Sequence, residues 1–226
     1  MARYVVVTAT DTGVGKTLVS TGLARALVAA GERVVAIKPF ETGLVGDERG
    51  DGEALAAATG QVEPRRALVR LRDPLTPALA AEREGVVLDV AAVTARIRGL
   101  AAGFDTAIVE GAGGVLSPLT WTADIVSLAR DLGAKHVVLV AADKLGTLSL
   151  THTAVKCLVD AGLTPSAIVL SAPSSPDLST GTNAAVLRRR LAGHGAVAEN
   201  IIELPRVTSD EEAARVLAKL PPAGGQ

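Results

Sequence analysis

A glycine-rich segment between a short apolar run and a helical stretch carries the clearest chemical signal in the chain. Residues 8–17 read TATDTGVGKT and directly follow three consecutive valines. In a loop of this kind the backbone N–H groups and the positive end of the helix dipole point at one place, where a polyphosphate can bind. Gly13 and Gly15 permit a close approach, Lys16 can reach the β- and γ-phosphate oxygens, and the Thr17 hydroxyl is placed to coordinate Mg²⁺. The segment predicts a nucleotide-binding loop, although Thr10 stands where the usual GxxxxGK[ST] pattern has its first glycine.

A second apolar run ends in an acid followed by a glycine-rich loop. Residues 106–109 read TAIV, and Glu110 follows at once, ahead of Gly111, Ala112, Gly113 and Gly114. Parallel sheets bring the carboxyl ends of their strands to the ligand crevice. A carboxylate at this position is suited to be the second protein ligand of Mg²⁺, shared with Thr17 and phosphate oxygens.

A third run, at residues 33–37, is followed by Lys38. A second lysine would then face the same crevice and supply positive charge to the acceptor side of a phosphoryl transfer, where negative charge accumulates. Asp51 opens the next helical stretch, and its carboxylate can either cap that helix or join the metal site. Position alone leaves both roles of Asp51 open.

The elements that must position these residues alternate along the whole chain. Short β-branched runs without polar alternation predict buried parallel strands, and Ala/Leu-rich stretches of helical period predict the crossover helices. We expect strands at residues 4–7, 33–37, 106–109, 136–140, 167–170 and 201–204. We expect helices at residues 17–30, 52–59, 90–102, 124–132, 148–160, 182–191 and 209–217. The pattern predicts an α/β protein, with a mainly parallel central sheet flanked by helices.

No internal repeat and no linker rich in Pro, Gly or Ser divides the sequence. We therefore expect one domain with a P-loop NTPase-like fold over residues 1–220. The last six residues, PPAGGQ at 221–226, can neither continue a helix nor bury much surface, so we expect a frayed tail.

Composition excludes several classes of function. The chain has 226 residues, with 23 Lys plus Arg against 24 Asp plus Glu, so it has no global basic field to hold nucleic acid or an anionic membrane. Every apolar run is shorter than a membrane span requires. Cys157 is the single cysteine, which excludes an intramolecular disulfide and fits a cytoplasmic protein. We expect no nucleic-acid partner and no membrane association.

With these residues assembled, the chain resembles the dethiobiotin synthetases. The resemblance covers almost the whole sequence and rests on several motifs in the same order: TDTGVGKT at 10–17, KP and TG within 38–43, PLTPA at 74–78, VEGAGG at 109–114 and KLGTL at 144–148. It implies ATP-dependent closure of the dethiobiotin ring from 7,8-diaminononanoate and CO₂ in biotin biosynthesis, by way of a carbamate and a carbamic-phosphoric anhydride. ADP and phosphate are released, ATP is a co-substrate, Mg²⁺ is the cofactor, and no protein nucleophile is needed.

The resemblance also implies roles for individual residues. Lys38 would stabilise the carbamate and its phosphorylation, and Lys16 and Thr12 would bind the phosphates and the transferring group. Thr17, Asp51 and Glu110 would hold Mg²⁺, with Glu53 as the alternative to Asp51. The remaining nucleotide contacts would come from Gly13, Val14, Gly15, Leu18, Gly111, Ala112, Gly113, Ser171, Pro205 and Val207.

For the substrate, the resemblance implies a contact to Thr42 and a homodimer whose active site spans the interface. Gly146, Thr147, Leu148 and Ser149 would bind the substrate carboxylate from the neighbouring subunit, at a helix N-terminus. Two positions depart from the family pattern. Ala9 stands in place of a glycine, and Ser171 stands where some members have an adenine-reading Asn, which leaves the base preference open.

Two other classes share this kind of loop. A ParA/MinD-type ATPase switch has an additional lysine early in the loop, and this chain has none between Thr8 and Gly15. An amidotransferase-family synthase, such as cobyrinate a,c-diamide synthase, normally adds a glutaminase domain with a nucleophilic cysteine, for which we expect no room in 226 residues. Both remain alternatives to the ligase.

Overall fold

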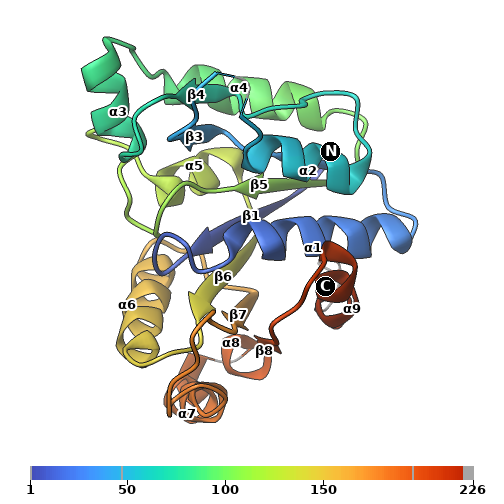
Figure 1. Cartoon of the computed structure of the whole chain (residues 1–226), viewed down its shortest axis with the longest axis vertical. Helices are drawn as coiled ribbons and strands as arrows, with labels where there is room; N and C mark the ends of the chain where they lie inside the picture. Colours follow the sequence, from blue (N-terminus) through green and yellow to red (C-terminus); the bar gives the residue numbers. More distant parts are fainter. Residues whose placement is uncertain (1, 47, 195, 221–226) are drawn as a thin grey trace.

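A six-stranded parallel sheet forms the centre of the protein (Figure 1). The computed structural model describes residues 2–46, 48–194 and 196–220. The strands lie in the order β2-β5-β1-β6-β7-β8 and every neighbouring pair is parallel. Their bounds are β1 (Arg3–Ala9), β2 (Val34–Ile37), β5 (Thr106–Glu110), β6 (His136–Ala142), β7 (Ala167–Ser171) and β8 (Ile201–Leu204).

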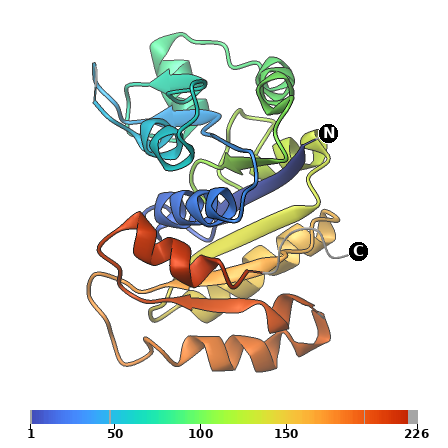
Figure 2. The same cartoon turned by 90° about the vertical axis from the view of Figure 1, so that its right-hand side faces the viewer.

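Helices cover both faces of this sheet. One face packs against α1 (Lys16–Ala29), α2 (Asp51–Thr59) and α9 (Asp210–Leu217), with α1 and α9 side by side (Figure 2). The opposite face packs against α4 (Val90–Ala101), α5 (Ile125–Leu132), α6 (Thr147–Asp160), α7 (Asn183–Arg190) and α8 (Ala196–Glu199). Successive residues of β1 alternate between the two cores: Val5 and Val7 pack on the first, Val6 on the second. Burial on both faces explains the continuous apolar runs in the sequence.

A second, two-stranded parallel sheet lies beyond the β2 edge. It pairs β3 (Phe40–Thr42) with β4 (Val69–Leu71) and packs against α3 (Pro77–Glu84) through Leu71, Ala80 and Ala81. Phe40 is fully buried in the main core, which ties this small sheet to the larger one. The strand β3 is thereby held close to the end of β2.

The predicted fold class and all six predicted strands of the central sheet are confirmed, and the seven predicted helices occur with ends that differ by one residue. Among the α-helices and strands of the described residues, β3, β4, α3 and α8 were not predicted. Two strands of three residues and a helix of four are too short for a periodic signal, and α3 starts at Pro77, three residues after Pro74. The predicted tail at 221–226 lies outside the described residues, and the boundaries of the domain stay a prediction.

None of the helices in the described part of the chain combines the length and the apolar character that crossing a membrane requires.

Candidate active site

The loop between β1 and α1 ends in a glycine that the local backbone requires. Gly15 is the residue before α1 and has φ of 97°, in the left-handed region that favours glycine. A Cβ at this position would also lie 2.9 Å from the Ser171 hydroxyl of β7. No side chain caps the first turn of α1. The first N–H groups of α1 are therefore available to a ligand at the mouth of the loop.

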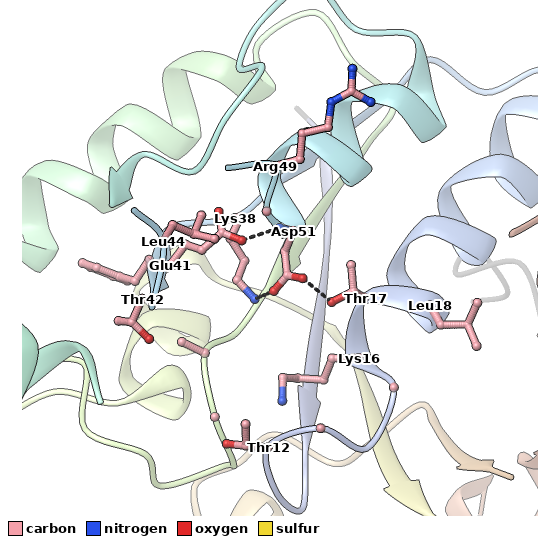
Figure 3. A pocket seen from close by; sticks show the side chains of 16 residues that line it. Thr12, Lys16, Thr17, Leu18, Lys38, Glu41, Thr42, Leu44, Arg49 and Asp51 are labelled. Carbon is pink, nitrogen blue, oxygen red and sulfur yellow. Dashed lines mark hydrogen bonds and ion pairs between the residues drawn. The ribbon is translucent and has the colours of Figure 1, made fainter. Parts of the chain in front are cut away.

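This loop borders a cavity of about 690 Å³, which we call the P-loop cavity (Figure 3). Its other walls come from the β2–β3 connection, the strand β3, residues 44, 49 and 50 that follow it, the start of α2 and the loop after β5. The lining residues are Thr12, Gly13, Gly15, Lys16, Thr17, Leu18, Lys38, Phe40, Glu41, Thr42, Leu44, Arg49, Gly50, Asp51, Ala112 and Gly113. Segments distant in the sequence thus converge at the carboxyl ends of neighbouring strands, as the sequence analysis expected for Lys16, Lys38 and Thr17.

Lys38 lies at the centre of a buried charge cluster. It is 4% exposed, and its Nζ donates to Oδ2 of Asp51 at 2.7 Å and to Oε1 of Glu110 at 2.6 Å. It also donates to the carbonyl oxygen of Gly111 at 3.3 Å. The Thr17 hydroxyl lies 2.8 Å from Oδ1 of Asp51 and 3.1 Å from Oε1 of Glu110. Lys38 is therefore part of the cavity wall and is not a solvent-exposed lysine in a turn.

The charges in this cluster stabilise one another. Burial alone would lower the pKa of Lys38, but the carboxylates of Glu110 and Asp51 outweigh burial and the pKa is raised. Burial acts to raise the pKa of Asp51, whereas the Lys38 cation and the hydrogen bonds from Lys38 and Thr17 hold it below its usual value. Lys38 and Asp51 therefore remain charged through neutral pH.

Lys16 approaches the same cavity from the loop. It is 8% exposed and its Nζ donates to the carbonyl oxygen of Asp11 at 3.1 Å. Burial lowers the pKa of Lys16, and the neighbouring Lys38 cation lowers it further. Two cations close to each other in a partly closed site favour an anionic ligand, since the ligand relieves their repulsion.

The oxygen atoms beside Lys38 fit a hard divalent cation. Oε2 of Glu110 is buried and accepts no hydrogen bond, so one carboxylate oxygen is free to bind a ligand. Thr17 and Asp51 add a hydroxyl and a second carboxylate within hydrogen-bond distance of each other. Oxygen donors of this kind suit Mg²⁺, which is commonly bound by one or two carboxylates together with water and phosphate oxygens. Within residues 2–46, 48–194 and 196–220, no three His, Cys, Asp or Glu side chains form a metal site.

The geometry separates Asp51 from Glu53. Oε2 of Glu53 accepts from the backbone N–H of Gly50 at 3.1 Å, and its Oε1 lies 3.3 Å from the guanidinium of Arg66. Glu53 therefore caps α2 and faces a basic surface, whereas Asp51 faces Thr17 and Lys38. Of the two acids, Asp51 is the one that shares the cluster with Glu110.

A second cavity, of about 400 Å³, lies on the other side of the loop, and we call it the β7–β8 cavity. It is lined by Asp11, Thr12, Gly13, Val14, Gly15, Leu18, Ala142, Lys144, Ser171, Ala172, Pro173, Ser174, Pro205, Arg206 and Val207. Three of the predicted nucleotide contacts, Ser171, Pro205 and Val207, are thus brought together. Thr12, Gly13, Gly15 and Leu18 line both cavities, so one extended ligand can run along the loop from one cavity to the other.

Comparison with known proteins agrees with this arrangement. A family model described as an AAA domain matches residues 3–224. The ATP-dependent dethiobiotin synthetase of Anaeromyxobacter dehalogenans strain 2CP-C is 43% identical over 190 residues, covering 83% of this chain and 85% of the relative. That of Anaeromyxobacter sp. strain Fw109-5 is 37% identical over 216 residues, covering 95% and 89%. The chain belongs to the dethiobiotin synthetase family.

Membership of the dethiobiotin synthetase family confirms the predicted resemblance and the prediction that the protein is a ligase. Solved structures with a similar fold include proteins that are not named dethiobiotin synthetases. The septum site-determining protein MinD of Pyrococcus horikoshii, complexed with Mg-ADP, has a TM-score of 0.57 and 16% identity, covering 97% of this chain and 94% of that one. A ParA family ATPase of Chlorobium tepidum has a TM-score of 0.56 and 14% identity, covering 97% and 96%. Identities this low show a shared fold and nothing further.

The dethiobiotin synthetase resemblance also predicted a substrate segment, and the structure places it away from the P-loop cavity. Gly146 precedes α6, and Thr147 is buried in its first turn. Leu148 and Ser149 line a separate cavity of about 340 Å³ with residues of α6 and α7. Within one chain, Thr42 lines the P-loop cavity and the 146–149 segment does not. A joint site would require a second subunit.

Five residues that line the P-loop cavity were not among the predicted site residues: Phe40, Glu41, Leu44, Arg49 and Gly50. Glu41 is 5% exposed and burial raises its pKa. Its place in the sequence gave no signal, because alternation along a strand would turn residue 41 away from the side of Phe40 and Thr42, whereas all three residues of β3 line the cavity.

Proposed function

We propose that this protein forms dethiobiotin from 7,8-diaminononanoate, CO₂ and ATP, with release of ADP and phosphate, in biotin biosynthesis. The observation that carries the proposal is the convergence of Lys16, Lys38 and the Thr17–Asp51–Glu110 oxygens on one cavity at the end of a nucleotide loop. Family membership supplies the substrate class, since the two relatives described above are named ATP-dependent dethiobiotin synthetases.

The reaction proceeds in three steps. One amine nitrogen of the substrate attacks CO₂ and loses a proton, which gives a carbamate. A carbamate oxygen then attacks the γ-phosphorus of ATP, and the bond to the β-phosphate oxygen breaks, giving ADP and a carbamic-phosphoric anhydride. The second amine finally attacks the carbonyl carbon, the bond to phosphate breaks, and the five-membered ring closes. Each step needs positioning and charge stabilisation rather than a protein nucleophile.

The two lysines divide the charge stabilisation between donor and acceptor. Lys16 and Thr12, with the N–H groups of Gly13, Val14 and Gly15, bind the phosphates and the transferring group. Lys38 is held in the cavity wall by Asp51 and Glu110 and stabilises the carbamate and the negative charge that builds up as the carbamate oxygen is phosphorylated. Thr42 supplies a hydroxyl for the substrate on the same wall.

Thr17, Asp51 and Glu110 would hold Mg²⁺ together with phosphate oxygens. When bound, the ion neutralises charge on the phosphates and orients the γ-phosphoryl group. The chain's own contribution is the free Oε2 of Glu110, the Asp51 carboxylate and the Thr17 hydroxyl, all within reach of the loop that binds the phosphates. Gly111, Ala112 and Gly113 let the nucleotide pass the end of β5 closely.

The nucleotide base would lie in the β7–β8 cavity, between Ser171 and the segment that contains Pro205 and Val207. Leu18, which borders both cavities, would pack against the sugar side of the nucleotide. We further propose a cytoplasmic homodimer in which Gly146, Thr147, Leu148 and Ser149 of one subunit bind the substrate carboxylate at the N-terminus of α6 and complete the site of the other.

Turnover with purified protein tests the proposal. The protein is incubated with ATP, Mg²⁺ and bicarbonate, with and without 7,8-diaminononanoate, and ADP and dethiobiotin are quantified together. We expect ADP formation to require the diamine and to match dethiobiotin in amount. ATP hydrolysis at the same rate with and without the diamine would contradict the proposal. It would favour an ATPase switch of the ParA/MinD type or an amidotransferase-like synthase.

The dimer has a separate test. Sedimentation should give twice the mass of one chain. Lys38→Met subunits mixed with subunits carrying Ser149→Trp should regain turnover, because each mixed dimer restores one complete site. Sedimentation at the mass of one chain with full activity would contradict the shared site.

A further inference from the structure

Glu41 is a buried acid in the wall of the P-loop cavity that the proposed chemistry does not use. It lies on β3, between the substrate residue Thr42 and Phe40 of the main core. Its carboxylate accepts a short hydrogen bond from the backbone N–H of Asp51 through Oε1, and one of 3.5 Å from the N–H of Gly52 through Oε2. The side chain thus reaches across the cavity wall to the start of α2 (Figure 3).

This contact replaces an ordinary helix cap. The residue before α2 is Gly50, which has no side chain to accept from the free N–H groups of the first turn. Glu41 accepts from two of these groups, although it belongs to another element. A Cβ at Gly50 would collide with the Glu41 carboxylate. Gly50 and Glu41 therefore form one unit, in which the absence of a side chain at one position lets the other approach.

Glu41, which can approach because position 50 is glycine, holds Asp51 through its backbone N–H group. Glu41 binds the N–H of Asp51, while the Asp51 carboxylate points the other way, with Oδ1 2.8 Å from the Thr17 hydroxyl and Oδ2 2.7 Å from Nζ of Lys38. The direction of the Asp51 side chain follows from where its backbone is fixed. Loss of the Glu41 contact would free the first turn of α2 and, with it, the position of that carboxylate.

Burial raises the pKa of Glu41, and the neighbouring Asp51 carboxylate acts in the same direction. An acid in such surroundings is stabilised by the positive end of a helix dipole and by donors from its first turn. The capping geometry therefore explains how the carboxylate is tolerated in a wall that already contains Asp51 and Glu110.

We propose that Glu41 is a positioning residue: by capping α2 from β3, it fixes the Asp51 carboxylate at the place where the divalent cation of the nucleotide binds. The inference rests on the proposed function for the identity of that ligand. Residues that orient metal ligands from behind change metal affinity or activity by roughly 10- to 100-fold when they are replaced. The same range is expected for loss of Glu41.

The test measures Mn²⁺ binding rather than turnover. Mn²⁺ is titrated by electron paramagnetic resonance against the full chain with a non-hydrolysable ATP analogue, and against the analogue alone as the baseline. Glu41→Ala should weaken Mn²⁺ binding by about 10-fold or more. Glu41→Gln retains a side-chain carbonyl that can accept from the Asp51 N–H, so it should restore most of the affinity. Binding of the analogue without metal should stay unchanged in both variants.

Glu84 offers a matched control. Its Oε1 also accepts from two backbone N–H groups, those of Arg72 at 2.6 Å and Asp73 at 3.2 Å, but it lies on α3 outside the P-loop cavity. Glu84→Ala should leave Mn²⁺ binding at the wild-type value. If Glu41→Ala does not fold, Gly50→Ala carries the test, since the added methyl group displaces the Glu41 carboxylate and should weaken Mn²⁺ binding in the same way.

Wild-type affinity in Glu41→Ala or in Gly50→Ala would overturn the inference. Equal losses in Glu41→Gln and Glu41→Ala would also overturn it, because the carboxylate would then act through its charge and not as a cap. Failure of the proposed function is seen separately: wild-type protein would bind the analogue and Mn²⁺ but form no dethiobiotin, and the variant series would still decide the role of Glu41.

Discussion

The two cavities along the nucleotide loop differ in what their walls are made of. The P-loop cavity contains the charged side chains of Lys16, Lys38, Glu41, Arg49 and Asp51. Lys38 pairs with Asp51 and with the buried Glu110, and Glu41 accepts a hydrogen bond from the backbone of Asp51. The β7–β8 cavity contains mostly small residues and prolines, with charged side chains at Asp11, Lys144 and Arg206. We therefore expect the P-loop cavity to recognise its ligand through charge, and the β7–β8 cavity to recognise its ligand through shape and backbone groups. Substitutions should therefore have large effects on chemistry in the first cavity and modest effects on selectivity in the second.

The largest effect is expected at Lys16, which directly follows the glycine loop that borders both cavities. Lys16→Ala removes the cation that we propose to contact the transferring phosphoryl group, and kcat/KM should fall by about 10³-fold. Steady-state kinetics with ATP and the diamine measure the loss. Lys156→Ala is the control, because Lys156 pairs with Asp160 on an exposed helix face and should have wild-type kinetics. A Lys16→Ala enzyme with nearly normal turnover would remove the charge argument for the P-loop cavity.

Lys38 should separate chemistry from nucleotide binding. Lys38→Met keeps an apolar stem of similar length but leaves Asp51 and Glu110 without their shared cation. We expect kcat to fall by about 10²- to 10³-fold while the dissociation constant of ATP hardly changes. Isothermal titration and single-turnover kinetics measure the two quantities. A large loss of ATP affinity with unchanged kcat would assign Lys38 to the nucleotide rather than to the acceptor.

Substitutions of Asp51 and Glu53 test which of these two acids serves the proposed metal site of the P-loop cavity. Asp51→Asn should raise the Mg²⁺ concentration for half-maximal rate by about 10-fold or more, because one of the two proposed carboxylate ligands loses its charge. Glu53→Gln should leave it unchanged, since Glu53 faces Gly50 and Arg66. The rate is measured against free Mg²⁺ at saturating ATP. The reverse order of effects would place the metal ligand at Glu53.

The smallest effect is expected in the β7–β8 cavity. Ser171→Asn introduces an amide that can pair with the adenine edge, and one net hydrogen bond is worth about 1 kcal/mol. The ratio of kcat/KM for ATP to that for other nucleoside triphosphates should rise by about fivefold to tenfold. Competition assays with the four nucleotides measure this ratio. Ser171→Ala serves as control and should not favour ATP, and a loss of turnover in Ser171→Asn comparable to that of Lys16→Ala would contradict the division between the cavities.

Much of the fold was predictable because parallel strands buried on both faces leave continuous apolar runs, as in residues 4–7 and 136–140. The short parallel pair β3–β4 was not predictable, since three residues carry no usable period. Within the site, Lys16 and Thr17 could be found because they end the glycine-rich loop after β1, and Lys38 because it directly follows β2. Glu41 could not, because its partners Asp51 and Gly52 are ten and eleven residues away along the chain and meet it only after β3 and α2 pack together.

The amino-acid sequence by itself determined the fold class, the nucleotide loop and the kinds of charged residue that surround it, because these depend on local order: a strand, a glycine-rich turn and a helix. Only the tertiary structure decided which acid stands beside Thr17, that Lys38 is buried between two carboxylates, and that Glu41 caps a helix from another element. Those outcomes depend on the directions of side chains from separate strands and helices. Directions are set by packing and by the pairing of buried charges, which no single stretch of sequence contains.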